Sequence, residues 1–256
     1  MKATRTIVLA LTALSLLSTA AAAMTVDELV AKALEAQGGQ AALAAVGTQT
    51  ATGKVLTQGL EIGLTMTYAR PGRMRADASV MGMSLVQCFS GESGWGINPM
   101  SGSQDAQPMS EVEAKMFKLQ SDLEPPYVDY AKKGYTVEYI GQEDVEGTPA
   151  HRLRLDTKQS VVLDFWFDAE SFLLLKQNTK VAIDQGEFET QSYPSDYRQV
   201  DGLTFPFGIE SRRGDQVMSQ IVIDSIEINV PVDDAIFVMP PKAAPAAPAA
   251  PDSTKN

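Results

Sequence analysis

Alternation of apolar and polar residues is the clearest pattern in this chain, and it predicts β-strands. In residues 60–69 every second side chain is apolar and the intervening ones are polar or small, so this strand has one apolar face. That face carries Leu60, Ile62, Leu64, Met66 and Tyr68. Period-two stretches fill the region from Thr50 to Pro99. Seven more strands are expected at 135–141, 150–156, 160–168, 172–182, 187–199, 203–213 and 217–229, separated by turn residues.

Helical spacing appears in two regions. Thr25 followed by Glu28 is a capping box, and the apolar residues after it recur at helical spacing until Gly38-Gly39 ends the helix. A short second helix is expected over 40–45. Helical spacing returns over 110–133, interrupted at Pro125-Pro126, and predicts helices on both sides of the prolines.

The order of these elements predicts a mainly β fold with some α-helix. About eleven consecutive antiparallel strands form a highly curved sheet, or incomplete antiparallel β-barrel, because a flat sheet of that width is unfavourable. The helices are too few to cover both faces of the sheet, so they are expected on the concave side.

Composition excludes several classes of function. The 256 residues carry a formal charge of −11 with a pI near 4.6, which argues against a nucleic-acid partner because phosphates are held by clustered Lys and Arg. One Cys and one His exclude a zinc site built from these residues and any disulfide within the chain. No Gly-rich phosphate loop is present, and no cofactor is expected.

Both ends of the chain lie outside the expected domain. Residues 1–23 have the basic start, short apolar run and Ala-x-Ala end of a secretory signal peptide, with cleavage expected after Ala23. The only Cys is Cys88, so no lipid-anchoring Cys follows the cut, and we expect a soluble periplasmic protein. Residues 240–256 are rich in Pro and Ala and predict a disordered tail. A single domain is expected over 24–239.

Two short motifs resemble the LolA-like outer-membrane lipoprotein-sorting family: the segment 68–75 with Arg70-Pro71 and the segment 90–99 with Gly91 and Trp95. Three more, in consistent order and spacing, are similar to those of a broader set of secreted relatives: Ala36-Gln37-Gly38-Gly39, the segment 196–207 and the segment 229–237. The resemblance implies an incomplete barrel with lid helices over a hydrophobic cavity. It also implies a carrier that takes acyl chains of a lipoprotein or lipid from an inner-membrane donor to an outer-membrane acceptor, acting as a monomer and without catalysis.

The resemblance also implies a role for Arg70, whose counterpart in the family hydrogen-bonds the lid helices and keeps the empty carrier closed. If the alternation continues past Tyr68, Arg70 lies on the apolar face at the end of its strand, where a charge needs partners. The alternative is that Pro71 ends the strand and Arg70 turns to solvent.

Candidate cavity residues follow from position and residue type. Seven of the 11 Met lie between Met66 and Met116, and unbranched thioether side chains repack around apolar ligands of different shape. Each of these residues has an ordinary place in a hydrophobic core as its alternative. The candidates are Leu64, Met66, Tyr68, Met74, Trp95, Met116, Phe117, Phe165 and Phe167.

Two other functions stay open. One is a binding protein of the same fold that senses acyl chains or lipoproteins and reports to an envelope-stress partner. The other is a cofactor-less enzyme that uses the cavity, with His151 alone or paired with Cys88. His151 falls on the buried side of its strand, where a hydrogen-bonded structural role is expected. Residues 91–95 resemble a nucleophile elbow without its last Gly or its strand-to-helix context.

Overall fold

The computed structural model describes residues 24–80, 82–102, 104–158, 160–183 and 186–242. The expected signal peptide, nearly all of the expected tail and Met81 lie outside the described residues. Within them, no helix is long and apolar enough to cross a membrane.

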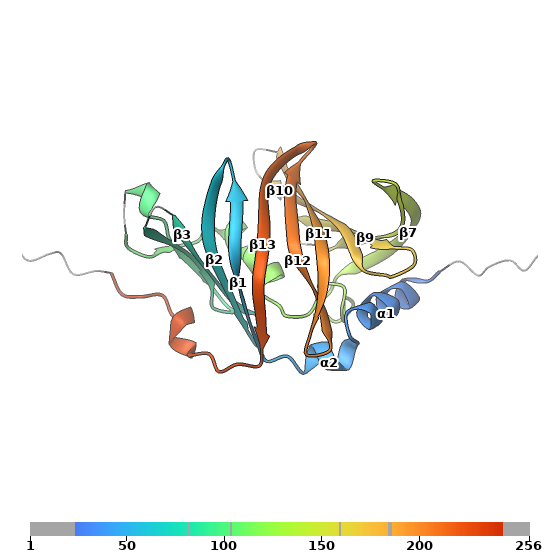
Figure 1. The fold of residues 1–256 in the computed structure, drawn as a ribbon, viewed down its shortest axis with the longest axis horizontal. Helices are drawn as coiled ribbons and strands as arrows, with labels where there is room; N and C mark the ends of the chain where they lie inside the picture. The colour runs from blue at the N-terminus through green and yellow to red at the C-terminus, as the bar shows by residue number, and fades with distance from the viewer. Residues whose placement is uncertain (1–23, 81, 103, 159, 184–185, 243–256) are drawn as a thin grey trace, which may run out of the picture.

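All strands belong to one antiparallel sheet with the order β6-β5-β4-β3-β2-β1-β13-β12-β11-β10-β9-β8-β7, which is not closed (Figure 1). The strands are β1 (Thr48–Thr57), β2 (Leu60–Ala69), β3 (Arg73–Val80), β4 (Met83–Phe89), β5 (Gly94–Ile97), β6 (Gln107–Pro108), β7 (Thr136–Val145), β8 (Thr148–Asp156), β9 (Val161–Asp168), β10 (Leu174–Ile183), β11 (Gly186–Val200), β12 (Leu203–Arg213) and β13 (Gln216–Ile228). The helices are α1 (Val26–Ala36), α2 (Gln40–Ala44) and α3 (Glu111–Gln120), with 3-10 turns η1 (Pro99–Ser101) and η2 (Asp234–Phe237).

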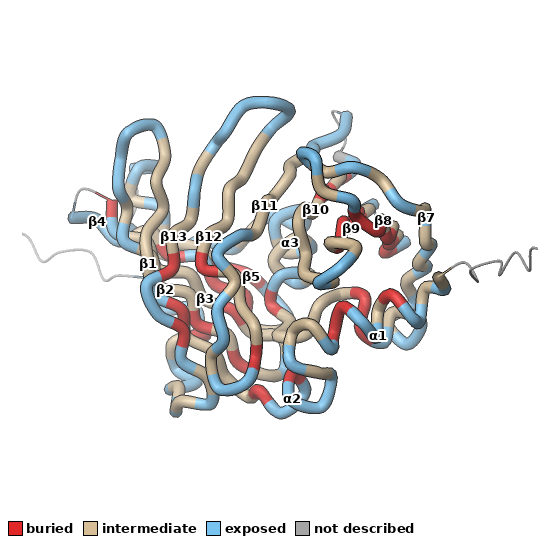
Figure 2. The backbone as a smooth tube through the Cα atoms, turned by 45° about the vertical axis from the view of Figure 1, so that its right-hand side comes forward, coloured by how far each residue is buried: buried red, intermediate tan, exposed pale blue. Residues whose placement is uncertain are grey.

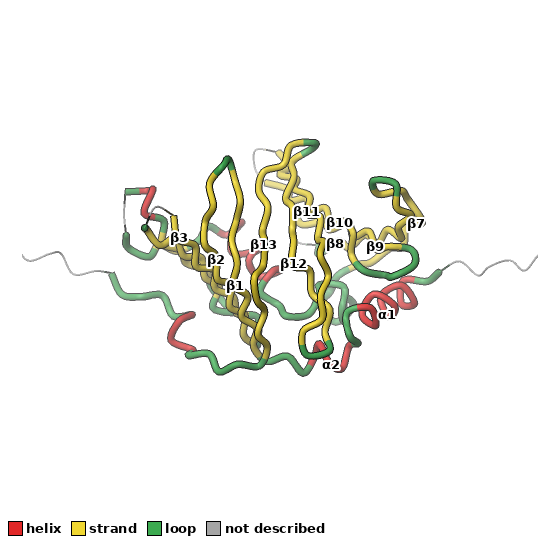
Figure 3. Tube along the Cα trace, viewed as in Figure 1, coloured by secondary structure: helices red, strands yellow, loops and turns green. Residues whose placement is uncertain are grey.

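The topology consists of two runs of consecutive hairpins joined at the centre of the sheet. β1 pairs with β2 on one side and with β13 on the other, so the first and last strands are neighbours. From this centre the chain runs outward to β6 in its first half and returns from β7 in its second. Figure 3 shows β1 and β13 side by side in the middle of the sheet. The incomplete antiparallel barrel predicted from the sequence is therefore confirmed.

Two details differ from the prediction. The residues that the structure describes form thirteen strands in place of about eleven, since β5 and β6 are only four and two residues long and are too short to show a period. The predicted helix after Pro125-Pro126 is wrong, because this segment consists of turns. Tyr127 and Val128 are both buried in the core, so the apolar residues that suggested a helix reflect tertiary packing of an irregular segment.

The main core lies on the inner face of the sheet, defined here as the face that carries the side chain of Tyr68. α1 buries Leu29, Ala33 and Leu34 there, against side chains of β8 and β9. The cluster consists of Leu29, Ala33, Leu34, Leu43, Val46, Tyr127, Val128, Leu153, Leu155, Val161, Leu163, Phe165, Phe167, Val181 and Leu203. The buried positions of α1 stand out in Figure 2, whereas α3 has none.

Part of the outer face is covered by the C-terminal segment 230–239, which lies beside β3 at the opposite end of the sheet from α1 (Figure 1). Arg73 forms an ion pair with Asp234 at 2.7 Å, and the Trp95 indole N–H donates to the Phe237 carbonyl at 3.0 Å. The motifs 68–75 and 90–99 thus hold on the sheet the segment that contains nearly all of a third motif, 229–237.

Two other motifs meet at the lower edge of the sheet. Gly38 has φ of +110°, and a Cβ there would lie 2.5 Å from the Gly202 carbonyl oxygen, so only glycine fits. The Thr204 amide donates to the Gln37 carbonyl at 3.0 Å beside this contact. The turn after α1 is therefore fixed against the start of β12, and this fixes the position of Gln37.

Candidate functional site

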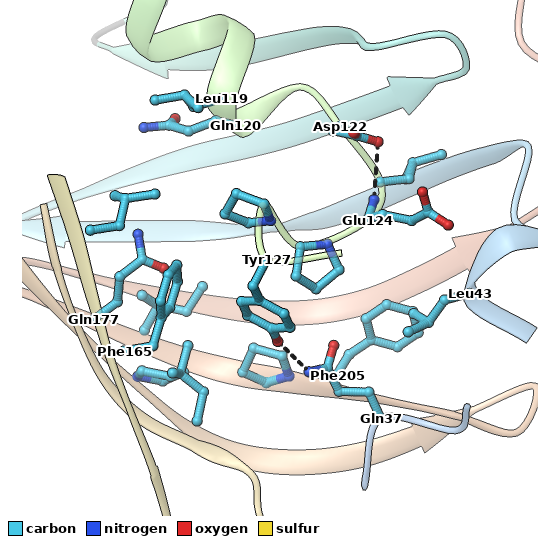
Figure 4. Close-up of a pocket in the computed structure, with 18 of the residues that line it drawn as sticks. Gln37, Leu43, Leu119, Gln120, Asp122, Glu124, Tyr127, Phe165, Gln177 and Phe205 are labelled. Carbon is cyan, nitrogen blue, oxygen red and sulfur yellow. Dashed lines mark hydrogen bonds between the residues drawn. The ribbon is translucent and has the colours of Figure 1, made fainter. Parts of the chain in front are cut away.

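A pocket of about 440 Å³ lies between the inner face of the sheet and the segments that cover it (Figure 4). This volume is within the range of about 300–1,000 Å³ that is typical of small-molecule sites. We call it the inner pocket. It is lined by Gln37, Leu43, Gln49, Tyr68, Met116, Leu119, Gln120, Asp122, Leu123, Glu124, Pro125, Pro126, Tyr127, Leu163, Phe165, Leu173, Leu174, Gln177, Thr179, Pro194, Tyr197, Thr204, Phe205, Pro206 and Ile209.

Tyr127 stands at the centre of this lining (Figure 4). Its ring makes edge contacts with Phe165 and Phe167, with centroid distances of 5.2 and 5.5 Å. Its hydroxyl accepts a hydrogen bond from the Gln37 side-chain amide at 2.9 Å. Burial raises the pKa of Tyr127, so the phenol stays protonated. The segment between α3 and β7 is anchored to the core by this residue.

Several polar groups of the pocket wall already have partners within the protein. The Tyr197 hydroxyl donates to the Leu174 carbonyl at 2.7 Å, and the Gln177 amide donates to the Thr179 hydroxyl at 3.2 Å. Burial raises the pKa of Tyr68 to about 12, so this phenol also remains neutral. Because these groups need no hydrogen bond from a ligand, the wall suits an apolar occupant.

The cover of the inner pocket is held less firmly than its floor. α3 contributes Met116, Leu119 and Gln120 to the lining, yet none of its residues is buried. Residues 122–126 complete the cover as an irregular segment with Asp122 and Glu124 at its edge. The floor, in contrast, consists of strands bonded on both sides.

Arg70 links the end of β2 to α2 and to this cover. Its Nε donates to the Val46 carbonyl at 2.7 Å, and its Nη2 donates to the Leu43 carbonyl at 3.2 Å, near the C-terminal end of α2. The same Nη2 lies 3.7 Å from a carboxylate oxygen of Glu124. The side chain therefore does not turn away into solvent. Leu43 and Glu124 both line the pocket, whereas Arg70 does not. Arg70 therefore connects α2 to the irregular segment 122–126 from outside the lining.

Of the nine candidate cavity residues, three line the inner pocket: Tyr68, Met116 and Phe165. Leu64, Met66 and Met74 share the inner face with Tyr68 but lie outside the lining. Met66 packs instead against Ala51 and Ile226, farther along β2. Alternation thus predicted the correct face, but it could not predict that the pocket occupies only one end of the strand.

The remaining candidates have structural positions. Phe167 is fully buried in the main core beneath Tyr127, and Phe117 is half-buried on α3 without reaching the lining. Trp95 lies on the outer face, where it packs under the C-terminal segment, so it does not face the pocket at all. Its strand β5 is too short for alternation to assign a face.

Several lining residues lie in motifs that had been used only to recognise the fold. Gln37 belongs to the motif at 36–39, and Tyr197, Thr204, Phe205 and Pro206 belong to the segment 196–207. The contact between Gly38 and Gly202 brings these two segments together at the edge of the pocket. Tyr127 was overlooked as a site residue, since its neighbours suggested an ordinary helix.

The residues considered for catalysis are not brought together. His151 is buried, and its Nδ1 lies 2.9 Å from the Tyr139 hydroxyl, as expected for a structural histidine. Cys88 is buried on the outer face of β4, and eight strands of the sheet lie between β4 and β8, the strand of His151. Burial raises the pKa of its thiol to about 11.

Residues 90–93 form a tight turn between two strands. Among the described residues, no group of three or more His, Cys, Asp or Glu is placed to hold a metal ion.

Comparison with solved structures identifies the fold. A DUF1329 family protein from Desulfovibrio piger aligns with a TM-score of 0.57 at 12% identity, covering 83% of this chain and 97% of that one. A LolA superfamily protein from Nitrosomonas europaea aligns with a TM-score of 0.57 at 12% identity, covering 84% and 98%. The chain has a LolA-like fold.

A domain from Vibrio parahaemolyticus, described as an outer membrane lipoprotein-sorting protein, shares this LolA-like fold. It aligns with a TM-score of 0.55 at 11% identity, covering 83% of this chain and 97% of that one. No family model and no curated protein matches the sequence. At such low identity the likeness establishes the fold, and function has to be argued from the pocket.

Proposed function

We propose that this LolA-like protein is a non-catalytic periplasmic carrier that binds an acyl chain of a lipid or lipoprotein in the inner pocket and moves it toward the outer membrane. The observation that carries the proposal is the pocket itself, whose apolar wall has many of its polar groups paired within the protein. The expected signal peptide and the fold of the Vibrio parahaemolyticus domain support the location and the class of cargo.

The energetics suit reversible carriage. Burial of an acyl chain of about 14 methylenes stabilises the complex by roughly 11 kcal/mol before costs, at about 0.8 kcal/mol for each methylene. Displacing a cover that buries none of its own α3 residues costs part of this free energy. Arg70 holds the cover to α2, and we propose that cargo loosens its contact with Glu124.

Binding of a fluorescent fatty-acyl probe tests the proposal. Met116→Asp places a charge in the lining, so we expect at least about tenfold weaker binding, because an unpaired carboxylate facing an acyl chain is strongly unfavourable. Val112→Asp on the same helix is the matched control, since Val112 is exposed and lies outside the lining, and it should bind normally.

Two results would contradict the proposal. One is wild-type protein that neither binds the probe nor carries acyl-containing molecules when purified from the periplasm, as judged by mass spectrometry. The other is equal binding by the Met116→Asp and Val112→Asp variants, because occupancy of the inner pocket requires them to differ.

A further inference from the structure

A second, smaller pocket of about 240 Å³ lies next to the inner pocket at α3, and every charged residue that lines it is a lysine. Lys115 and Lys118 come from α3, and Lys133 comes from the segment before β7. Leu119, Tyr135, Thr157 and Val161 complete the lining. We call this the lysine pocket.

The charge of this pocket is opposite to that of the protein. The chain carries a net charge of −11, yet three ammonium groups surround this cavity without a carboxylate in its lining. Lys133 forms an ion pair with Asp122 at 3.3 Å. Lys115 and Lys118 have no carboxylate within ion-pairing distance among the residues that the structure describes. Like charges that converge on one site repel each other, and a bound anion removes that repulsion.

The lysine pocket and the inner pocket share two walls. Leu119 lines both, and on α3 the lysines Lys115 and Lys118 are direct neighbours in sequence of Met116 and Leu119 in the apolar lining. On β9, Val161 lines the lysine pocket, whereas Leu163 and Phe165 line the inner pocket. Alternate residues of a strand are about 7 Å apart and point to the same face, so the two cavities are adjacent along the inner face.

From this arrangement we propose that the lysine pocket binds the anionic headgroup, phosphate or carboxylate, of a lipid whose acyl chain occupies the inner pocket. The proposal rests on the proposed function and narrows it to anionic amphiphiles. A ligand with its chain against Phe165 and Leu163 passes Leu119 and places its headgroup among the three ammonium groups. The lysines then supply head-group selectivity, while the apolar wall supplies most of the affinity.

Two lysolipids with the same palmitoyl chain test this. Lysophosphatidylglycerol has an anionic headgroup, and lysophosphatidylcholine has a zwitterionic one. In the Lys115→Gln/Lys118→Gln variant we expect the Kd for lysophosphatidylglycerol to rise about fivefold, from the loss of two partly exposed ion pairs, and the Kd for lysophosphatidylcholine to change less than twofold. Added salt should weaken binding of the anionic lipid to the wild type in the same way.

Lys132→Gln/Lys158→Gln is the matched control. It changes the net charge equally, but both of these lysines are exposed and lie outside the lysine pocket. Two results would overturn the headgroup assignment and leave the carrier proposal intact. One is an equal rise in the Kd for lysophosphatidylglycerol in the two double variants. The other is an equal rise in the Kd for both lysolipids in the Lys115→Gln/Lys118→Gln variant. Failure of the wild type to bind either lysolipid would instead refute the carrier proposal.

Glycerol phosphate should not displace the anionic lysolipid, and displacement at similar concentration would show a site for free phosphate esters instead.

Discussion

The two longer helices of this protein begin in the same way and are held in different ways. α1 starts with a capping box of Thr25 and Glu28, and α3 starts with a capping box of Ser110 and Glu113. They are 11 and 10 residues long. α1 buries three side chains in the main core, whereas α3 buries none among the same number of turns.

This difference distinguishes the core, which contains α1, from the cover of the pockets, which contains α3. Equal local signals start both helices, but tertiary burial decides how firmly each is attached. α1 shares the main core cluster with side chains of β8 and β9, whereas α3 lines both the inner pocket and the lysine pocket. A carrier needs both, because the sheet has to stay folded while ligand enters and leaves.

The largest expected effect tests the two helices through their apolar side chains. Leu29→Ala on α1 removes a fully buried side chain and leaves a cavity, so the free energy of unfolding should fall by about 2–5 kcal/mol. Leu119→Ala on α3 removes a half-buried side chain and should cost at most about 1.5 kcal/mol. Urea unfolding of both variants measures this, and equal losses would contradict the contrast drawn between the helices.

A smaller effect is expected at the capping boxes. Thr25→Ala and Ser110→Ala each remove the side-chain acceptor of an N3 amide, a loss of about 1 kcal/mol in helix stability. For α1 the loss should appear in global unfolding, because α1 leaves the core only when the protein unfolds. For α3 it should appear as faster hydrogen exchange of the α3 amides, with the urea midpoint unchanged. A lowered urea midpoint in the Ser110 variant would show that α3 is part of the cooperative core.

The smallest expected effect is a dependence of the free energy of unfolding on pH, caused by His151 near α1. Burial, together with the charge of Lys32 on α1, lowers the pKa of His151 below 6.5. The unfolded chain therefore binds a proton more readily, so the free energy of unfolding should decrease as the pH falls from about 7.5 to about 5.5. His151→Gln should have a flatter pH profile over this range. An unchanged slope would assign the pH dependence to other groups.

Strand positions were largely predictable from the sequence, and so were the helix starts. The seven strands of the second half agree with their predicted ranges to within a few residues, because alternation repeats over eight or more residues there. Segment 121–134 was not predictable in this way. Its apolar residues are spaced by contacts to distant strands, as in the packing of Tyr127 on Phe165 and Phe167.

Where the candidate cavity residues lie depends on the cover as well as on the strand face. Tyr68 and Phe165 line the inner pocket, and each lies on an apolar strand face. Met66 lies on the same face but packs into a separate cluster with Ala51 and Ile226. Its position farther along the strand decides which side chains surround it. Trp95 lies on the other face of the sheet, beneath a segment more than 130 residues later in the chain.

The sequence by itself determined the period of the longer strands, the capping box of α1, the residue count that excludes a disulfide within the chain, and the motifs that resemble the LolA-like family. These are local properties, since each depends on residues close together in the chain. Only the tertiary structure decided which residues surround the inner pocket and that Lys115, Lys118 and Lys133 converge on one cavity. A pocket depends on how far a sheet curves and on what covers it, and both result from contacts between residues far apart in the sequence.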